Sequence, residues 1–456
     1  MRTRKSTLDK LERELRSLEK EIENKIELPS DPVEFAKKIL NFTPLPYQEQ
    51  LLRDPSKRIV VRMSRQTGKT TIIAVKAIWF AATHPKTLTL IVSPSMRQSM
   101  IMMDRIHSFL TAPPEKIRRT LIFKLQRTVV WFRNGSQIVA LPCSIHLLRG
   151  YTAHMVLVDE GGFIRDDETL YYNVLYPMLA TTDGTLIVSS TPWGKDSVFY
   201  KMNNDPAFSK HVVTWREAVA SGLIKQEFIE EMQRVLPAER FQREFEAQFV
   251  EDADSYFPQD LITKCIDSEL EYYSFEDHPT GDFYIGVDFG KKVDHSAIAV
   301  VERLSNGTIR LVHLFRFPLE TPYASVIGYI KALSDRYKHV YNICVDQTGI
   351  GEYITEDMMR AGIPNVQGIV LTMQRKQEIL GSLKQKMQND QFRIPYDPDL
   401  IAEINIEKFE LTKEGQIKFS HPEGAHDDRL WAVALAVYAA SKSASVIEVG
   451  RGRLWK

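Results

Sequence analysis

Between residues 58 and 195, short apolar runs alternate with segments of helical periodicity. The apolar runs are RIVVRM, TLTLIVSP, TVVWF, SQIVALP, MVLVDE and TLIVSSTP. Strands that alternate with helices along the chain favour a largely parallel sheet covered by helices on both faces. This pattern therefore predicts an α/β domain, to which we assign residues 31–255 with its linker helices.

A different pattern begins near residue 282. FYIGVDFG, SAIAVVERL and TIRLVHLFRF read as three strands, and SNG between the last two is typical of a hairpin turn. A helix at about 324–337, the strand YNICVD and a final apolar helix, LWAVALAVYAA, follow. We expect a second domain, a mixed sheet with helices, over residues 281–445, joined to the first by a junction at 256–280. A length of 456 residues is enough for two such cores.

The two ends of the chain differ from these domains. Residues 7–28 place leucine and isoleucine at three- and four-residue steps among charged residues, which predicts an amphipathic helix within residues 1–30, ended by PSDP. This helix either packs on its own domain or serves as an arm for a partner or a second copy, since it is too short to hold a coiled coil alone. Residues 446–456 form a short basic tail.

Composition limits the class of protein. Lysine plus arginine and aspartate plus glutamate number 59 each, so any surface for nucleic acid must be a local patch. The three cysteines, Cys143, Cys265 and Cys344, lie far apart without metal-type spacing, which suits a reducing compartment. Apolar runs are too short to cross a bilayer, and the amino terminus lacks the apolar core of a signal peptide. We therefore expect a soluble intracellular protein without a membrane partner.

The segment RIVVRMSRQTGKTTIIAVKAIWFAA reads as strand, loop and helix, which is the context of a phosphate-binding P-loop. Backbone N–H groups of the loop and the helix amino terminus would hold phosphates, Lys69 would reach the β- and γ-phosphates, and the Thr70 hydroxyl would bind Mg²⁺. Met63 stands where the motif has its first glycine, so the loop alone is a weak signal. The predicted nucleotide-binding residues are Ser64, Arg65, Gln66, Thr67, Gly68, Lys69 and Thr70.

An acidic pair supports the nucleotide interpretation. The strand in HMVLVDEGGF ends in Asp159 and Glu160, at the sheet edge where open α/β sheets bind ligands. Asp159 can hold the metal, and Glu160 can polarise the attacking water. A single acidic pair after a strand is also common as a solvated strand end. In this order and these contexts, the loop and the acidic pair together predict ATP hydrolysis.

Four further residues are weaker candidates for the same site. Gln48 in PLPYQEQLL could read the adenine edge and Tyr47 could pack near the base, although both also suit an ordinary helix surface. Thr191 ends the strand LIVSST and could sense the γ-phosphate, or it could simply belong to the turn at Pro192. Arg149 in LLRGYTAH could stabilise transition-state charge, and as a lone residue it is equally a surface arginine.

Carboxylates recur at corresponding places in the second pattern. Asp288 lies on its first strand, Asp346 ends its fourth, and Asp427 and Asp428 open the last helix. This placement matches an RNase H-like nuclease, in which two Mg²⁺ or Mn²⁺ ions about 4 Å apart need clustered oxygen ligands. Each aspartate alone could be a cap or a strand-end residue. Asp294 and His426 are secondary candidates, and the pattern leaves open which of Asp427 and Asp428 is the primary ligand.

An ATPase followed by an RNase H-like nuclease resembles the large terminase subunit of tailed bacteriophages, over roughly residues 40 to 440. The resemblance rests on SRQTGKT, VLVDE, SSTP, REFEAQFVEDADSYF, GVDFG, CVDQTG and HDDRLWAVALA, in this order. It accounts for the missing first glycine and for Arg65 within the loop, both common in that family. It also implies that Arg149 acts in a neighbouring subunit. Asp346 departs from relatives that have glutamate there, which leaves the metal preference open.

The resemblance also implies a biological setting. The protein would bind ATP and double-stranded DNA, be recruited by a small terminase subunit and dock on the portal of a procapsid in the host cytoplasm. We expect a homo-oligomeric ring when docked and a monomer in solution. The basic tail could contact portal or DNA, or remain an unstructured end. The main alternative is a helicase-type ATPase–nuclease of repair or restriction, which usually needs a second motor lobe, and residues 195–280 are too few for one.

Overall fold

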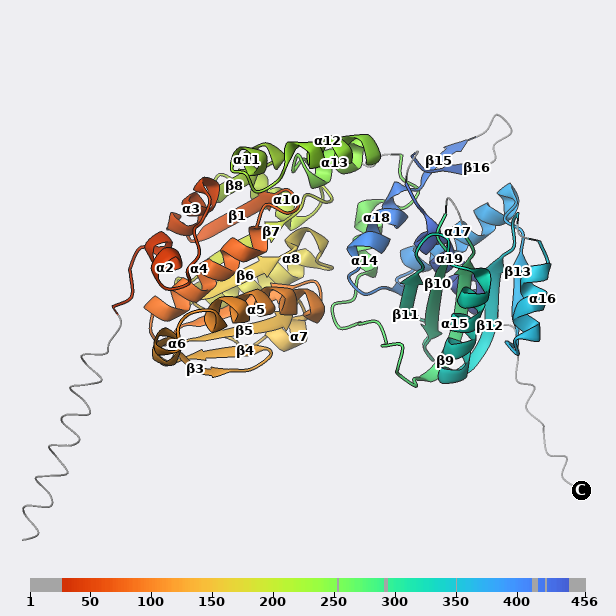
Figure 1. Cartoon of the computed structure of the whole chain (residues 1–456), viewed down its shortest axis with the longest axis horizontal. Helices are drawn as coiled ribbons and strands as arrows, with labels where there is room; N and C mark the ends of the chain where they lie inside the picture. Colours follow the sequence, from red (N-terminus) through yellow and green to blue (C-terminus); the bar gives the residue numbers. More distant parts are fainter. Residues whose placement is uncertain are drawn as a thin grey trace, which may run out of the picture.

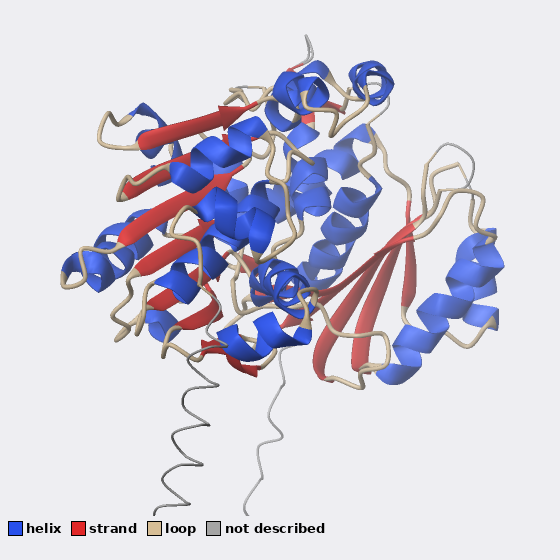
Figure 2. Ribbon diagram, turned by 60° about the vertical axis from the view of Figure 1, so that its left-hand side comes forward, coloured by secondary structure: helices blue, strands red, loops and turns tan. Residues whose placement is uncertain are grey.

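The computed structural model describes residues 27–251, 254–290, 294–349, 351–411, 417–422 and 425–442 (Figure 1). The predicted tail at 446–456 lies outside these ranges, as does nearly all of the helix predicted over 7–28. Two sheets, each with its own helices, form the two halves of the molecule (Figure 2). The first half therefore carries the sheet expected before residue 255, and the second half the sheet expected after residue 281.

The first sheet has eight strands in the order β3-β4-β5-β2-β6-β7-β1-β8. All neighbours from β5 to β8 are parallel, whereas β3 and β4 extend the sheet in antiparallel fashion. This confirms the mainly parallel α/β fold. The strands are β1 (Arg58–Met63), β2 (Leu88–Ser93), β3 (Ile122–Leu125), β4 (Val129–Phe132), β5 (Gln137–Pro142), β6 (Met155–Asp159), β7 (Thr185–Ser190) and β8 (Ser209–Val213).

Helices cover both faces of this sheet. Along β1, Ile59 and Val61 belong to one hydrophobic core and Val60 to the other, as alternating side chains of a doubly covered strand must. The first core contains helices α2 to α5 and the second contains α8 to α10. The helices are α2 (Pro32–Lys38), α3 (Pro46–Arg53), α4 (Lys69–Thr83), α5 (Met96–Thr111), α6 (Glu115–Leu121), α7 (Ile145–Leu148), α8 (Asp167–Leu170), α9 (Tyr176–Ala180) and α10 (Val198–Asn204), with short η1 (Gly161–Phe163) and η2 (Tyr171–Leu175) turns.

Three short helices follow β8 and form a small core of their own around Phe241 and Phe245. They are α11 (Trp215–Ala220), α12 (Gln226–Val235) and α13 (Ala238–Glu244). Pro237 occupies the N-cap position of α13 and separates it from α12. The carboxyl end of α13 lies against the P-loop, because the backbone N–H of Arg65 donates to the carbonyl of Glu244 over 2.8 Å.

The second sheet has six strands in the order β13-β12-β9-β10-β11-β14. Strands β9 to β11 form the expected antiparallel meander, and β12 pairs parallel with β9. This is the mixed sheet of the RNase H-like plan. The elements are β9 (Thr280–Asp288), β10 (Ala297–Arg303), β11 (Ile309–Arg316), β12 (Lys338–Asp346), β13 (Val366–Ile369), β14 (Phe392–Arg393), the hairpin of β15 (Lys408–Leu411) and β16 (Ile417–Ser420), α14 (Gln259–Cys265), α15 (Tyr323–Arg336), α16 (Tyr353–Arg360), α17 (Met373–Gln388), α18 (Pro398–Ile406) and α19 (Asp428–Lys442).

The junction at 256–280 is part of the packing of the second half. Helix α14 contributes Leu261, Ile262 and Cys265 to the core that surrounds α19. That core also contains Phe163 and Trp193 from the first half, and α14 and α18 lie on the side of the second half that faces the first (Figure 1). The two halves are therefore joined by buried side chains as well as by the chain itself.

Helix α19 crosses the second sheet at unusually short range. A Cβ atom added to Gly286 in β9 would lie 2.0 Å from the carbonyl oxygen of Ala432 and 2.3 Å from the backbone nitrogen of Ala436. Only glycine permits this approach of helix to strand, and buried alanines on α19 supply the matching surface. The contact places the amino terminus of α19, with Asp427 and Asp428, beside the carboxyl end of β9.

We predict that Gly286→Ala lowers the free energy of unfolding by about 3 kcal/mol or more, because the colliding atoms belong to backbone and cannot rotate away. Chemical denaturation followed by circular dichroism measures the change. Gly328→Ala, inside α15 with no atom within 4 Å of the added Cβ, is the matched control. It should stabilise the chain by up to about 1 kcal/mol, as alanine does in a helix. Equal stability of the two variants would contradict this packing.

Candidate nucleotide and metal sites

The loop between β1 and α4 has the conformation of a phosphate-binding loop. Gln66 and Gly68 have positive φ angles of 61° and 79°, and α4 begins at Lys69. The backbone N–H groups at this helix amino terminus have no partners within the helix and therefore suit an anion. Met63 is the last residue of β1 and is fully buried in the core, so the loop begins only at Ser64. The chain thus has a strand residue where the common motif has glycine.

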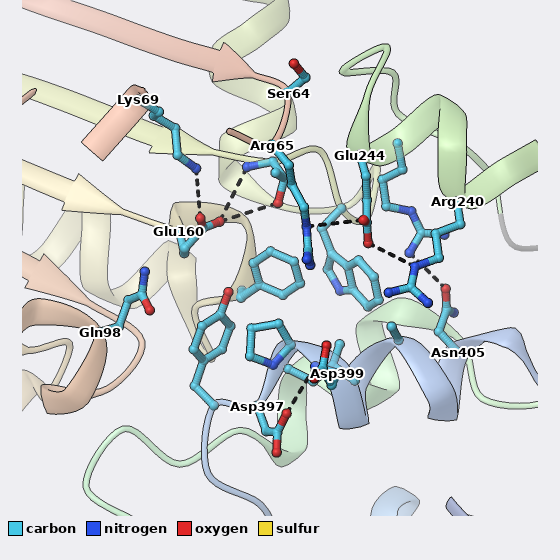
Figure 3. Close-up of a pocket in the computed structure, with 18 of the residues that line it drawn as sticks. Ser64, Arg65, Lys69, Gln98, Glu160, Arg240, Glu244, Asp397, Asp399 and Asn405 are labelled. Carbon is cyan, nitrogen blue, oxygen red and sulfur yellow. Dashed lines mark hydrogen bonds and ion pairs between the residues drawn. The ribbon is translucent and has the colours of Figure 1, made fainter. Parts of the chain in front are cut away.

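The structure brings the Lys69 side chain to the acidic pair. The Lys69 Nζ lies 2.8 Å from Glu160 Oε1 (Figure 3). The same nitrogen lies 3.9 Å from Asp159 Oδ1. Thr191 donates to Glu160 Oε2 through both its backbone N–H and its hydroxyl, each over 3.4 Å. The Ser189 hydroxyl donates to Asp159 Oδ1 over 2.8 Å. These residues come from α4, β6 and β7, whose ends meet at one edge of the sheet.

The two carboxylates differ in their electrostatics. Asp159 is completely buried, and burial raises its pKa even though Lys69 opposes the shift. Burial also acts to raise the pKa of Glu160, but the Lys69 ammonium and the hydrogen bonds from Lys69 and Thr191 outweigh it, so the pKa falls. Glu160 has a φ of 52°, an unfavourable left-handed conformation for a residue with a side chain. Glu160 is therefore held ionised and in a strained geometry.

Tyr47 and Gln48 are both buried on α3 and contact the P-loop backbone. The Tyr47 hydroxyl donates to the Thr67 carbonyl over 2.9 Å, and Gln48 Nε2 donates to the same oxygen over 3.4 Å. Gln48 also lies so close to Gly68 that a Cβ there would meet its Nε2 at 2.7 Å. In this structure both side chains support the loop, and their contact with adenine stays a prediction.

A cavity of about 790 Å³ opens in front of the loop and is shared by both halves of the chain. Arg65 lies in its wall, with its Nε 3.2 Å from Glu244 Oε2, and Arg240 Nε lies 3.1 Å from the other oxygen of that carboxylate (Figure 3). The lining residues that sequence reasoning missed include Gln98, Arg243 and Glu244 of the first half and Tyr396, Asp397, Asp399 and Asn405 of the second. Arg243 and Glu244 open the REFEAQFV segment noted above, but nothing in it indicated contact with the loop. The residues of the second half reach the loop only because the two halves dock.

Arg149 is placed elsewhere. It follows the short helix α7, and its exposed side chain makes no hydrogen bond or ion pair with any residue that the structure describes. It is not among the residues that line the cavity. A role toward the nucleotide of the same chain is therefore not supported by the geometry, and action in a neighbouring subunit stays a prediction.

The predicted nuclease acids converge at one edge of the second sheet. Asp288 and Asp346 end the neighbouring parallel strands β9 and β12, where Val287 pairs with Val345. Burial raises the pKa of Asp288 far above its usual value, and the charges of Asp346, Asp428, Asp427 and Asp294 raise it further. So many carboxylates in one place repel each other unless a cation is bound, which fits the oxygen-rich surroundings of Mg²⁺ or Mn²⁺.

Asp428 and Asp427 have different neighbours. Asp428 is almost fully buried, its Oδ2 has no hydrogen-bond partner, and burial raises its pKa to about 7. Ligand atoms of Asp428, Asp294 and His426 lie within 4.8 Å of one another, which brings both secondary candidates to the site. Asp428 therefore has the environment expected of a metal ligand.

Asp427 turns the other way, toward residues that sequence reasoning missed. Its Oδ2 accepts a hydrogen bond from Trp431 Nε1 over 2.7 Å and lies 3.3 Å from His421 Nδ1. Ligand atoms of Asp427, His421 and Glu407 lie within 4.8 Å of one another. No sequence motif marks Glu407 or His421, and only the pairing of the β15–β16 hairpin brings them together.

We predict that Lys69→Met destabilises the nucleotide-free chain by roughly 3–5 kcal/mol, because it leaves Glu160 and buried Asp159 without their cation. Thermal unfolding without nucleotide checks this. The matched control is Lys201→Met, which removes the exposed ion pair with Glu168 and should cost less than about 1 kcal/mol. Similar melting temperatures for the two variants would show that the Lys69 pair contributes little to the fold.

Among the described residues, no helix is both long and apolar enough to cross a membrane.

Comparison with known proteins points to one family. Residues 61–264 match the family model of the amino-terminal part of the terminase large subunit, T4-like-virus type. Over 438 residues, covering 87% of this chain and 88% of each relative, the chain is 24% identical to the terminase large subunit of Thermus phage G20c and 25% identical to that of Thermus virus P23-45. The solved structure of the HK97 bacteriophage large terminase is 14% identical, with 89% of this chain and 98% of that chain covered and a TM-score of 0.39. The chain is thus similar to the large terminase subunits of bacteriophages along most of its length.

Proposed function

We propose that this protein is the motor subunit that packages viral DNA. ATP hydrolysis at the P-loop site drives double-stranded DNA through the portal into a procapsid, and the nuclease domain cuts concatemeric DNA at the start and the end of packaging. One observation carries the proposal: a lysine with an acidic pair converges on one sheet and four aspartates converge on another, within a single chain.

The ATPase step follows from the contacts of Lys69. Lys69 neutralises Glu160 through a direct ion pair. When ATP enters, its β- and γ-phosphates compete for the Lys69 ammonium, which releases the Glu160 carboxylate to accept a proton from the attacking water. Thr191, which donates to the same carboxylate, connects that change to the end of β7. A Mg²⁺ ion bound by Thr70 and Asp159 would supply charge neutralisation on the phosphates.

The nuclease step follows from the crowding around Asp288. Asp288, Asp346 and Asp428 offer oxygen ligands for Mg²⁺ or Mn²⁺, with Asp427, Asp294 and His426 close by. Two such ions, held by these carboxylates, would supply charge neutralisation at the attacking and the leaving oxygen of the phosphodiester. Contacts of this kind reach only the backbone of DNA, so we expect cutting with little sequence preference.

Assembly completes the proposal. The exposed Arg149 side chain has no partner within its own chain among the described residues, which suits insertion into the nucleotide site of a neighbouring subunit. We therefore propose a homo-oligomeric ring on the portal in the host cytoplasm, with the small terminase subunit delivering DNA. A helicase is less well supported, because the strands in the described part of residues 195–280 are only β8 and the first residue of β9, too little for the sheet of a second motor lobe.

We predict that Glu160→Gln still binds ATP but lowers kcat by about 10²–10⁴-fold, because only activation of the water is lost. Steady-state ATPase assays and equilibrium binding of a labelled nucleotide measure the two effects. Glu168→Gln, on the exposed side of α8, is the control and should hydrolyse ATP at the rate of the unchanged chain. Turnover by Glu160→Gln close to that of the control would rule out Glu160 as the base.

We predict that Asp288→Asn abolishes DNA cutting by the full chain with Mg²⁺ or Mn²⁺, and leaves its ATPase unchanged. The matched control is Asp282→Asn, near the opposite end of the same strand, which should cut normally. Cleavage of linear plasmid on gels, with parallel ATPase assays, measures both activities, and cutting should weaken steeply as salt rises. Persistent cutting by Asp288→Asn would place the nuclease site elsewhere.

A further inference from the structure

A second group of potential metal ligands lies at the base of the β15–β16 hairpin, and it shares only Asp427 with the residues considered above for cutting. Lys408 pairs with Ser420 in this antiparallel hairpin. One step further toward the base, the same register sets Glu407 opposite His421. Asp427, just before α19, brings its carboxylate to both side chains. The carboxylates of Glu407 and Asp427 and the imidazole of His421 therefore meet where the hairpin joins the rest of the domain.

The Glu407 side chain is difficult to explain without a ligand. Glu407 is 2% exposed, and its Oε2 has no hydrogen-bond partner. Leaving a buried carboxylate oxygen unsatisfied is costly, and such groups usually coordinate a metal or pair with a charge. Its backbone is fixed, because the Glu407 carbonyl accepts a hydrogen bond from the Tyr256 N–H over 2.7 Å. The carboxylate is thus held against the cluster.

Other cations do not neutralise this group directly. Lys376 lies near enough to influence Glu407, but its ammonium sits 5.1 Å from the centre of the Trp431 ring and makes no ion pair with a described residue. His421 contacts Asp427, and its side chain is partly open to solvent, at 39% exposure. Solvent can therefore reach the cluster from the His421 side, which gives an ion a path to enter.

We propose that Glu407, His421 and Asp427 bind a divalent cation that fastens the base of the β15–β16 hairpin to the start of α19, as a site separate from the one formed by Asp288, Asp346 and Asp428. Two carboxylates with one imidazole favour a first-row ion such as Mn²⁺ over Mg²⁺, because imidazole suits softer ions. Ligands about 2.1 Å from an ion lie at most about 4.2 Å apart. The three ligand atoms, now within 4.8 Å of one another, close slightly around the ion.

The test counts Mn²⁺ ions bound to the metal-stripped full chain, by electron paramagnetic resonance of the free ion during titration. Glu407→Gln and His421→Gln should each lose one bound ion, or weaken its binding about tenfold or more. His421→Gln changes a partly exposed side chain, so its effect on ion binding does not depend on how a new side chain packs in a buried position. Glu410→Gln, exposed on the same hairpin, is the matched control and should bind as the unchanged chain does.

Asp288→Asn separates this site from the nuclease centre. It should keep the ion that Glu407→Gln loses, whether or not the chain cuts DNA, so the result does not depend on the proposed function. Circular dichroism confirms that each variant is folded. The proposal is overturned if folded Glu407→Gln gives the same Mn²⁺ isotherm as the control, or if Asp288→Asn removes the same ion.

Discussion

The ends of the parallel strands β6, β7 and β1 meet at one edge of the first sheet, and the first site depends on this pairing. The register sets Asp159 beside Ser189 and Arg62 beside Ser190, so the loop after β1 opens directly over the acidic pair. Lys69, the first residue of α4, is then close enough for its ammonium to pair directly with Glu160. A shift of one residue in this register would turn the acidic side chains to the opposite face.

The second site depends on a different constraint, the close approach of α19 to β9 at Gly286. This approach brings Asp428 into a buried position among other carboxylates, which is unfavourable for the metal-free fold. Tight packing of the alanine-rich helix α19 therefore offsets the unfavourable burial of these carboxylates, whose charges a bound cation would neutralise. Such concentrations of unfavourable charge are typical of functional sites.

Helix α18 connects the two sites physically. Its Asp399 lines the nucleotide cavity and lies 3.3 Å from Arg429 Nη2. Further along the same helix, Glu403 accepts a hydrogen bond from the backbone N–H of Arg429 over 2.8 Å and pairs with its guanidinium. Arg429 directly follows Asp428. A single helix thus lines the cavity in front of the P-loop and contacts the residue that follows Asp428.

The sequence by itself determined what depends on neighbouring residues along the chain. Strand β1 and the strands containing Asp159, Asp288 and Asp346 were predictable because apolar runs and their flanking turns reflect local preferences. The loop from Ser64 to Thr70 was predictable because its order follows from one strand, one turn and one helix. Edge strands β3 and β8 were not predicted, since their residues are only partly buried and lack a continuous apolar run.

Only the tertiary structure decided which distant residues share a site. Tyr396 and Asp399 reach the nucleotide cavity because the two halves dock, and no local pattern encodes that contact. Glu407 and His421 meet because a hairpin pairs them across residues whose own sequence carries no metal motif. The same reason separates Asp427 from Asp428: both open one helix, but successive side chains on a helix point in different directions, and the surrounding fold sets what each one contacts.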